Sequence, residues 1–324
     1  MSARSRDLLS AALIGAGIMG AGELYFACHA STNADGAYWK DWFDSEKYFT
    51  GQGAVGTAHA SMGSGRNDVL LLGSAAGIDT TTTITWSNNL CHIVGMNPAW
   101  PGQRSQRSRV NATGNFTPVW TVSGYGNLFA NVAFNHGQSS SANLNLINIT
   151  GARNYFKNCH FACYTANEMQ VATYNMISLG DCSEVGFEGC YIGTDSVAMA
   201  SGTLLHYTSN TTVRALYTNC NFVMCANSAA PTFIHVKPGA GRGTSIFKNC
   251  VFANNSSTAC TIGIASSGMS AQRFYFDANS YFAGVTDVGN AAEEAYIFFS
   301  PAMAQSTDAA HVQVGLGLSF DHTS

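Results

Sequence analysis

A six-residue motif that recurs along the chain places the strongest constraint on its fold. It reads F-K-N-C-H-F at Phe156–Phe161, and most copies keep the cysteine between two large apolar residues. Copies begin at Phe129, Phe187, Tyr217 and Phe247, and one more ends at Phe282. From Val132 to Ser280, the fourth position recurs after 27, 31, 30, 30 and 30 residues. A period of this length is typical of a solenoid, in which stacked repeats bury their apolar faces against one another.

The order of residue types inside the motif predicts a strand, a corner and a second strand. Side chains alternate between the faces of a strand, so the cysteine and the apolar residue two positions later share one face. The first aromatic lies three residues before the cysteine, and a corner at the intervening asparagine brings it to the same face. Asparagine tolerates a left-handed backbone, and Gly189 takes its place in one copy. The predicted corner residues are Asn131, Asn158, Asn219, Asn249 and Asn279. The predicted interior ladder comprises Phe156, Cys159, Phe161, Phe187, Cys190, Ile192, Tyr217, Cys220, Phe222, Phe247, Cys250 and Phe252.

A second landmark precedes each motif and predicts another strand in every coil. It is an apolar run of the β type, and Gly, Ser, Asn and Thr fill the connections. Coils with at least two strand faces, stacked in register, make a parallel β-helix. Asp68–Leu72 predicts a buried strand before these runs, and Thr83–Gly95 predicts the first clear coil. The runs are Val119–Val122, Leu144–Ile149, Met176–Leu179, Leu204–Tyr207, Phe233–Val236, Ile262–Ile264 and Tyr296–Phe299.

We expect one all-β domain, because a solenoid grows in one dimension and need not split at 324 residues. The prediction is an N-terminal apolar arm or cap over residues 1–35, a parallel β-helix of about eight coils over 36–300, and a C-terminal cap strand over 301–324. The arm follows Arg4 and Arg6 and resembles a signal peptide. We expect it to be retained, to cap the open end or to dock on a partner. The predicted anchor residues are Leu8, Leu9, Leu13, Ile14, Ile18, Met19, Leu24, Tyr25 and Phe26.

The arm also contains a match to a dinucleotide-binding fingerprint. Gly15, Gly17 and Gly20 fit the spacing G-x-G-x-x-G. That fingerprint needs a strand before it, a helix after it and an acidic residue at the end of a second strand. Asp35 and Asp41 lie near the required distance but in a polar turn, and no alternating βαβ pattern follows. The sequence therefore favours a small-residue arm over a nucleotide site.

Composition and cysteine spacing restrict the classes of function. Charged residues make up 10% and the net charge is −4, which does not support nucleic-acid binding. Four of the ten cysteines occupy one position in successive coils. Side chains stacked in neighbouring parallel strands stay about 4.8 Å apart, whereas the Cβ atoms of a disulfide lie about 3.8 Å apart. We therefore predict a buried ladder of free thiols, as suits a protein folded in a reducing cytosol.

The acidic and histidine residues do not form a recognisable catalytic or metal set. The densest acidic group is Asp181, Glu184, Glu188 and Asp195, with Asp181 and Asp195 expected in separate loops. Glu188 aligns with Lys157 one coil away, which predicts an exposed ion pair worth about 0.5 kcal/mol. His206 and His235 also align and have no evident third ligand, so we expect a surface pair rather than a metal site.

Several segments between residues 36 and 285 carry a resemblance to a known family. They are D-V-L-L-L at 68–72, I-T-W-S-N-N-L-C-H-I-V-G at 84–95, Q-R-S-R-V at 106–110, G-A-R-N-Y-F-K-N-C-H-F at 151–161 and E-V-G-F-E-G-C-Y-I-G-T-D-S-V-A at 184–198. Their order resembles the pectate-lyase-like right-handed β-helix proteins found among the virion proteins of tailed bacteriophages. The resemblance implies a right-handed helix and a structural protein on the capsid or in the tail, often trimeric.

Together these observations predict a non-enzymatic virion protein without catalytic residues, metal or cofactor. We expect a homotrimeric capsid decoration (cement) protein that is made in the host cytoplasm, lies on the capsid surface and bridges subunits of the major capsid protein. Neither nucleic acid nor a membrane is an expected partner. The alternative is a tailspike or fibre module that binds or cleaves host surface polysaccharide, and a third option is a cellular β-helix protein that binds carbohydrate.

Overall fold

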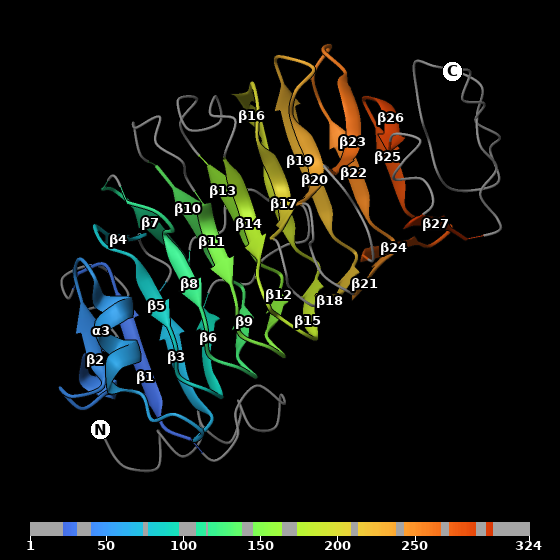
Figure 1. Ribbon diagram of the computed structural model, residues 1–324. Coiled ribbons are helices and arrows are strands. Elements are labelled where there is room, and N and C mark those ends of the chain that lie inside the picture. Colours follow the sequence, from blue (N-terminus) through green and yellow to red (C-terminus); the bar gives the residue numbers. More distant parts are fainter. Residues whose placement is uncertain are drawn as a thin grey trace.

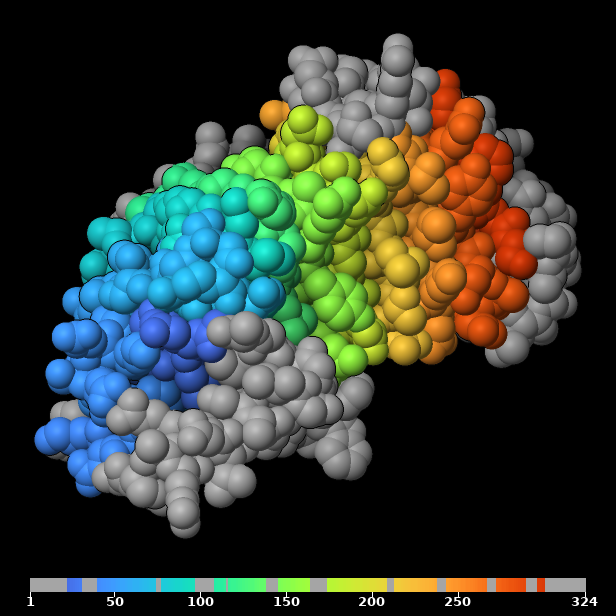
Figure 2. Space-filling view, turned by 90° about the horizontal axis from the view of Figure 1, so that it is seen from below, coloured from blue at the N-terminus to red at the C-terminus, as the bar shows by residue number. Residues whose placement is uncertain are grey.

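The chain folds into a right-handed single-stranded parallel β-helix (Figure 1). Three parallel sheets run the length of the stack, and each coil contributes one strand to each sheet in turn. In the space-filling view the coils follow one another along the long axis as successive bands of colour (Figure 2). The computed structural model describes residues 22–30, 40–73, 77–96, 108–114, 116–137, 145–163, 174–208, 213–237, 243–266, 272–289 and 296–300.

Sheet A carries the first half of each motif, sheet B the second half and sheet C the apolar runs. In spatial order sheet A contains β2 (Tyr48–Thr50), β1 (Leu24–Cys28), β3 (Asp68–Leu72), β6 (Cys91–Gly95), β9 (Leu128–Ala130), β12 (Tyr155–Lys157), β15 (Val185–Glu188), β18 (Arg214–Thr218), β21 (Gly243–Lys248), β24 (Gln272–Phe276) and β27 (Ile297–Phe299). Sheet B contains β4 (Ile78–Thr80), β7 (Arg109–Ala112), β10 (Ala133–His136), β13 (His160–Cys163), β16 (Tyr191–Met199), β19 (Asn221–Ala226), β22 (Val251–Asn254) and β25 (Tyr281–Ala283). Sheet C contains β5 (Ile84–Trp86), β8 (Trp120–Val122), β11 (Asn145–Ile149), β14 (Asn175–Leu179), β17 (Thr203–Tyr207), β20 (Thr232–Val236), β23 (Cys260–Ser266) and β26 (Val285–Gly289).

The first aromatic of each motif forms an inner ladder along sheet A. Its rings stack nearly parallel, with centroids 4.5–5.0 Å apart, close to the ~4.8 Å spacing of the strands. A second stack follows sheet B, where for example Phe222 and Phe252 lie 4.4 Å apart. All predicted ladder residues are buried, so the first aromatic, the cysteine and the last apolar residue of each motif face the core as expected. The rings of the inner ladder belong to Phe129, Phe156, Phe187, Tyr217, Phe247 and Phe276.

The predicted corner is confirmed at four asparagines and is wrong at the fifth. Asn131, Asn158, Asn219 and Asn249 have φ angles of 51–56°, and Gly189 has 62°. The last corner contains one more residue, because Phe276 pairs with Phe247 whereas Tyr281 pairs with Val251. The extra length lets the chain turn without a left-handed residue at Asn279. There the Asp277 carboxylate accepts the hydrogen bond from the Asn249 N–H at 2.9 Å, in place of the backbone carbonyl used in earlier coils.

The cysteine of each motif satisfies a backbone carbonyl at the corner. Its thiol donates to the carbonyl of the first aromatic one coil earlier, as from Cys190 to Phe156 at 3.3 Å and from Cys220 to Phe187 at 3.5 Å. The Ser280 hydroxyl takes the equivalent place, 3.3 Å from the Phe247 carbonyl and 2.7 Å from the Asp277 carboxylate. All ten cysteines are free thiols. Five of the six copies therefore place a small buried side chain with a thiol or hydroxyl at this position, whereas Val132 fills it with an apolar side chain alone.

The N-terminal end is covered by the helix α3 (Ala54–Ser61), which follows the short 3-10 turn η1 (Lys40–Trp42). The helix packs on β1, β2 and β5, and the His59 ring lies 4.3 Å from the Trp86 ring (Figure 1). Leu24, Tyr25 and Phe26, predicted as part of an apolar arm, instead lie in β1, which pairs with β2 and β3. The β-helix therefore begins before residue 36, the boundary predicted from the sequence. The other six predicted anchor residues and the tail 301–324 lie outside the described residues.

The last apolar run belongs to a different sheet from the one predicted. The sequence pattern groups Tyr296–Phe299 with the runs of sheet C, but β27 pairs with β24 of sheet A. The corresponding place in sheet C is taken by β26, whose sequence V-T-D-V-G is too polar to be recognised as an apolar run. Within the described part of the chain, no helix has both the length and the hydropathy that a membrane span requires.

Candidate functional site

The outward side chains of sheet A form three rows that run along the helix axis. The middle row contains the residue immediately before the first aromatic of each coil, held in register by the strand pairing. We call this row the apolar stripe, and it consists of Tyr155, Gly186, Leu216, Ile246, Tyr275 and Phe298. Its large side chains are 36–42% exposed. Five of the seven large hydrophobic side chains that are exposed in the described residues lie in this one row.

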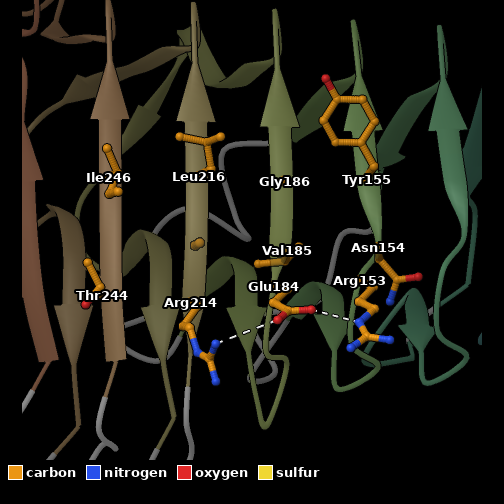
Figure 3. A pocket seen from close by; sticks show the side chains of 11 residues that line it. Arg153, Asn154, Tyr155, Glu184, Val185, Gly186, Arg214, Leu216, Thr244 and Ile246 are labelled. Carbon is orange, nitrogen blue, oxygen red and sulfur yellow. Dashed lines mark hydrogen bonds and ion pairs between the residues drawn. The ribbon is translucent and has the colours of Figure 1, made fainter.

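Charged rows border the stripe on both sides. On the upstream border, Glu184 pairs with Arg153 at 2.7 Å and with Arg214 at 3.7 Å (Figure 3). The row continues through Thr244 to Arg273 in the same register. On the downstream border, Lys157 pairs with Glu188 at 3.3 Å, which confirms the ion pair predicted from their alignment. The downstream border consists of Lys157, Glu188, Thr218 and Lys248 in register, followed by Asp277, which comes directly after β24 and donates its backbone N–H to the Phe247 carbonyl.

A shallow hollow of about 470 Å³ lies between the stripe and the upstream border (Figure 3). Gly186 forms its low point, because the neighbours of this residue in the stripe are Tyr155 and Leu216. A Cβ atom at position 186 would lie only 2.6 Å from the Tyr155 ring, so glycine is what allows the ring to lie over this strand. The Tyr155 hydroxyl then donates a hydrogen bond to Glu188, which fixes the ring across the stripe.

Two carboxylates of this face, Glu184 and Glu188, have pKa values lowered by their partners. The hydrogen bond and the positive charge of Arg153 lower the pKa of Glu184. The hydrogen bond from Tyr155, together with Lys157, lowers the pKa of Glu188 against the opposing effect of partial burial. A general acid needs a raised pKa to hold its proton near neutral pH. These groups are therefore suited to ion pairing and recognition rather than to proton transfer.

The other acidic and histidine candidates from the sequence do not lie on the outer face of sheet A. Asp195 lies in the irregular part of β16 and not in a loop as predicted, whereas Asp181 follows β14 in a turn. The rings of His206 and His235 stack at 5.4 Å on the outside of sheet C. Among the described residues, no group of three or more His, Cys, Asp or Glu side chains could hold a metal ion.

One buried carboxylate has a structural role that the sequence did not reveal. Asp68 is fully buried and accepts hydrogen bonds from the backbone of Glu23 at 2.8 Å and of Gly63 at 2.7 Å. Arg66 adds an ion pair at 2.6 Å. A buried carboxylate with this many donors is satisfied. Asp68 joins the segment before β1 to the loop before β3, so we assign it a structural role.

Sequence reasoning also missed the apolar stripe, although a signal was present. An apolar residue directly precedes the first aromatic of the motif at Tyr155, Leu216, Ile246, Tyr275 and Phe298. A strand that is buried on one face and solvated on the other would have a polar residue there. Repetition of this exception every coil could have identified an outward face that is not simply solvated.

Comparison with known proteins gives similarity in structure alone. No family model matches the chain, and no curated protein matches it. The crystal structure of the pectate lyase Pel9A is 10% identical, with a TM-score of 0.45 over 90% of this chain and 84% of that one. The Geobacillus virus E2 protein ORF18 is 14% identical, with a TM-score of 0.31 over 76% of this chain, which spans 57% of that protein. We take the role of this chain from its own residues.

Proposed function

We propose that this chain is a non-enzymatic structural protein of a phage virion, acting as a homotrimeric capsid decoration (cement) protein that bridges major capsid subunits. The observation that carries the proposal is the outer face of sheet A, where one exposed apolar row follows the helix from β12 to β27. Contiguous apolar surface of this kind is typical of a surface that binds another protein. The sequence resemblance described above supports the virion setting.

The mechanical role follows from how the helix is built. Eleven strands of sheet A at a spacing of about 4.8 Å make a face roughly 48 Å long. Stacked aromatic rings fill the core behind this face, so it resists bending. Three such rods around a threefold axis would contact several capsid subunits at once, and the part of the predicted arm that precedes the β-helix, residues 1–21, would add an anchor.

The chemistry of the carboxylates supports a non-enzymatic role. Glycoside hydrolysis needs one carboxylic acid with a raised pKa, and lyases of this fold need clustered carboxylates to hold Ca²⁺. On the outer face of sheet A the pKa values of Glu184 and Glu188 are lowered instead, and both side chains are engaged in ion pairs. The buried Asp68 already accepts four hydrogen bonds from Glu23, Gly63 and Arg66.

Quantitative mass spectrometry of purified virions tests the location. Hundreds of copies per particle are expected for a capsid protein, whereas roughly eighteen copies would indicate tail spikes, given symmetric closed assembly. Sedimentation of the purified protein tests the trimer, and a monomer at micromolar concentration would contradict it. Deletion of residues 1–21 should abolish binding to particles and leave the β-helix folded, as judged by circular dichroism. Unchanged occupancy would refute the anchoring role of the arm.

One observation favours the alternative of a tailspike or fibre module that binds host polysaccharide. The hollow on sheet A combines the Tyr155 ring with the guanidinium groups of Arg153 and Arg214. An aromatic ring packs against the apolar face of a sugar, and guanidinium groups bind carboxylates in pairs of hydrogen bonds. Incubation with host capsular polysaccharide or lipopolysaccharide separates the two functions. Shortened or retained polysaccharide would favour the tailspike, and unchanged, unbound polysaccharide would favour the capsid protein.

A further inference from the structure

We propose that the apolar stripe and its two charged borders form the docking surface for a protein partner that presents apolar side chains flanked by carboxylates. This inference rests on the proposed function, because it names the face by which the chain meets a neighbouring subunit of the particle. It also specifies the chemistry of that neighbour.

The regular arrangement of the apolar stripe indicates a binding surface rather than a chance cluster of exposed residues. Isolated exposed hydrophobic residues are ordinary on a protein surface. Here large exposed apolar side chains instead occupy the same register position in five of six successive coils, and neighbouring strands are about 4.8 Å apart. Leu216 and Ile246 at the centre are aliphatic, and Tyr275 stacks on Phe298 with ring centroids 4.8 Å apart. The stripe is thus an apolar ridge over four successive strands from Leu216 to Phe298, separated from Tyr155 by the low point at Gly186.

The charge of the borders argues for a partner of opposite sign. They contain five basic side chains and three acidic ones, a net charge of +2, whereas the whole chain carries −4. Two copies meeting face to face through this surface would bring two positive faces together, which disfavours a second copy as the occupant. A partner with carboxylates on both sides of an apolar strip would be complementary. The charged side chains are Arg153, Lys157, Arg214, Lys248, Arg273, Glu184, Glu188 and Asp277.

The hollow beside Gly186 provides a specific contact within this surface. It is large enough to accept one bulky apolar side chain between Tyr155 and Leu216. Its rim is preorganised, because Glu184 holds Arg153 and Arg214 in place by ion pairs. These two arginines are still 71% and 62% exposed, so most of their N–H groups remain available to a partner carboxylate. An apolar anchor in a pocket with charged groups at its rim is the usual form of a binding hot spot.

The test is rebinding of purified protein to virus particles from which this protein has been removed. Leu216→Asp and Ile246→Asp place a negative charge on the stripe and should weaken binding about thirtyfold each. Tyr281→Asp is the matched control, because Tyr281 is equally exposed but lies on sheet B. It should bind like the wild type. Thermal unfolding of all three variants checks that they are folded.

The charge component has its own measurement. Arg153→Glu and Arg214→Glu should each weaken binding to the stripped particles, and added salt should weaken wild-type binding because salt screens opposite charges. Arg66→Glu is unsuitable as a control, since Arg66 supports the buried Asp68. Lys40→Glu, on the N-terminal segment, changes the net charge equally and should leave binding unchanged. Equal binding by the two arginine variants and wild type would overturn the acidic nature of the partner.

The outcomes separate this inference from the proposed function. If wild type and every variant bind particles equally, the docking surface is wrong and the capsid function stands. If the wild type does not bind, the proposed function fails and the docking surface fails with it. If Leu216→Asp converts a trimer into a monomer in sedimentation, the stripe is an interface between copies and the acidic partner is refuted. If acidic polysaccharide binds the wild type but not Leu216→Asp, the partner is a polysaccharide and the inference is overturned.

Discussion

The inner and outer faces of sheet A come from the same strands but follow different rules. On the inner face Phe156, Phe187, Tyr217, Phe247 and Phe276 are all aromatic and at most 3% exposed. On the outer face the preceding residues are Tyr, Gly, Leu, Ile and Tyr. The inner face is constrained because each ring must stack on the rings above and below it. The outer face has no such constraint, so its apolar character is not explained by the fold and points to a partner.

The largest effect is expected when the inner ladder is broken. Phe187→Ala should lower the free energy of unfolding by about 3–5 kcal/mol, because it removes a ring that stacks on both Phe156 and Tyr217. Leu216→Ala, on the outer face of the next strand, should cost about 0.5 kcal/mol or less. Urea denaturation of both variants measures the difference. Similar losses would show that the outer row supports the fold as much as the inner one, and would remove the reason to assign it to a partner.

The repeat made the inner face predictable, and the reasons are local. A short motif with fixed parity determines the strand, the corner and the buried residues, so Phe187, Cys190 and Asn158 could be assigned from spacing alone. Asn279 was assigned wrongly because one inserted residue changes the corner without changing its residue types. β26 was missed because a strand at the end of a solenoid has less core to cover, and V-T-D-V-G has too few apolar residues to be recognised.

The outer face was far less predictable, because several of its contacts involve residues that lie outside the six-residue motif. The Lys157–Glu188 pair was found because both residues occupy the same motif position. The hydrogen bond from Tyr155 to Glu188 crosses from one position to another, and the hollow depends on the missing side chain of Gly186. Neither follows from composition or periodicity. The repeated apolar residue before each motif aromatic was also present in the sequence, but it was not recognised as a surface feature.

A second prediction concerns an outward residue that behaves like an inner one. His206 lies on the outer side of sheet C but is only 5% exposed, and burial lowers its pKa from 6.5 to about 4, with His235 and Lys237 acting in the same direction. Since the unfolded state binds the proton more tightly, stability is retained above pH 6.5 and lost as pH falls toward 4. Between pH 7 and pH 4.5 this residue should account for about 2 kcal/mol of the loss.

Chemical denaturation of the wild type and His206→Asn at the two pH values measures this contribution. The variant should lose less stability than the wild type when the pH falls, although His59, with a pKa lowered to about 4 by burial, keeps part of the effect. An identical pH dependence in both proteins would show that His206 is as solvated as an ordinary outer residue. In that case every residue on the outer side of a sheet would be solvated and every residue on the inner side buried.

A third prediction tests the hydrogen bond that the cysteines add to the inner face. Cys220→Ala removes the donor to the Phe187 carbonyl and leaves a small cavity, at a cost of about 1–3 kcal/mol. Cys220→Ser should cost less, because its hydroxyl can still donate to the Phe187 carbonyl, and Ser280 fits the equivalent place in the last coil. Thermal unfolding of the two variants decides. Equal stability of the two would show that the cysteine serves only as a small apolar filler.

The smallest effect is expected from the ion pair that borders the apolar stripe. Glu188→Gln removes the charge partner of Lys157 but keeps an acceptor for the Tyr155 hydroxyl, so the free energy of unfolding should fall by about 0.5 kcal/mol or less. Glu46→Gln, at an exposed position near the N-terminus, is the matched control. Urea denaturation at low and high salt measures both. A loss above about 2 kcal/mol would mean that the border is part of the fold's own stability, in the manner of Asp68, rather than a solvated edge available to a partner.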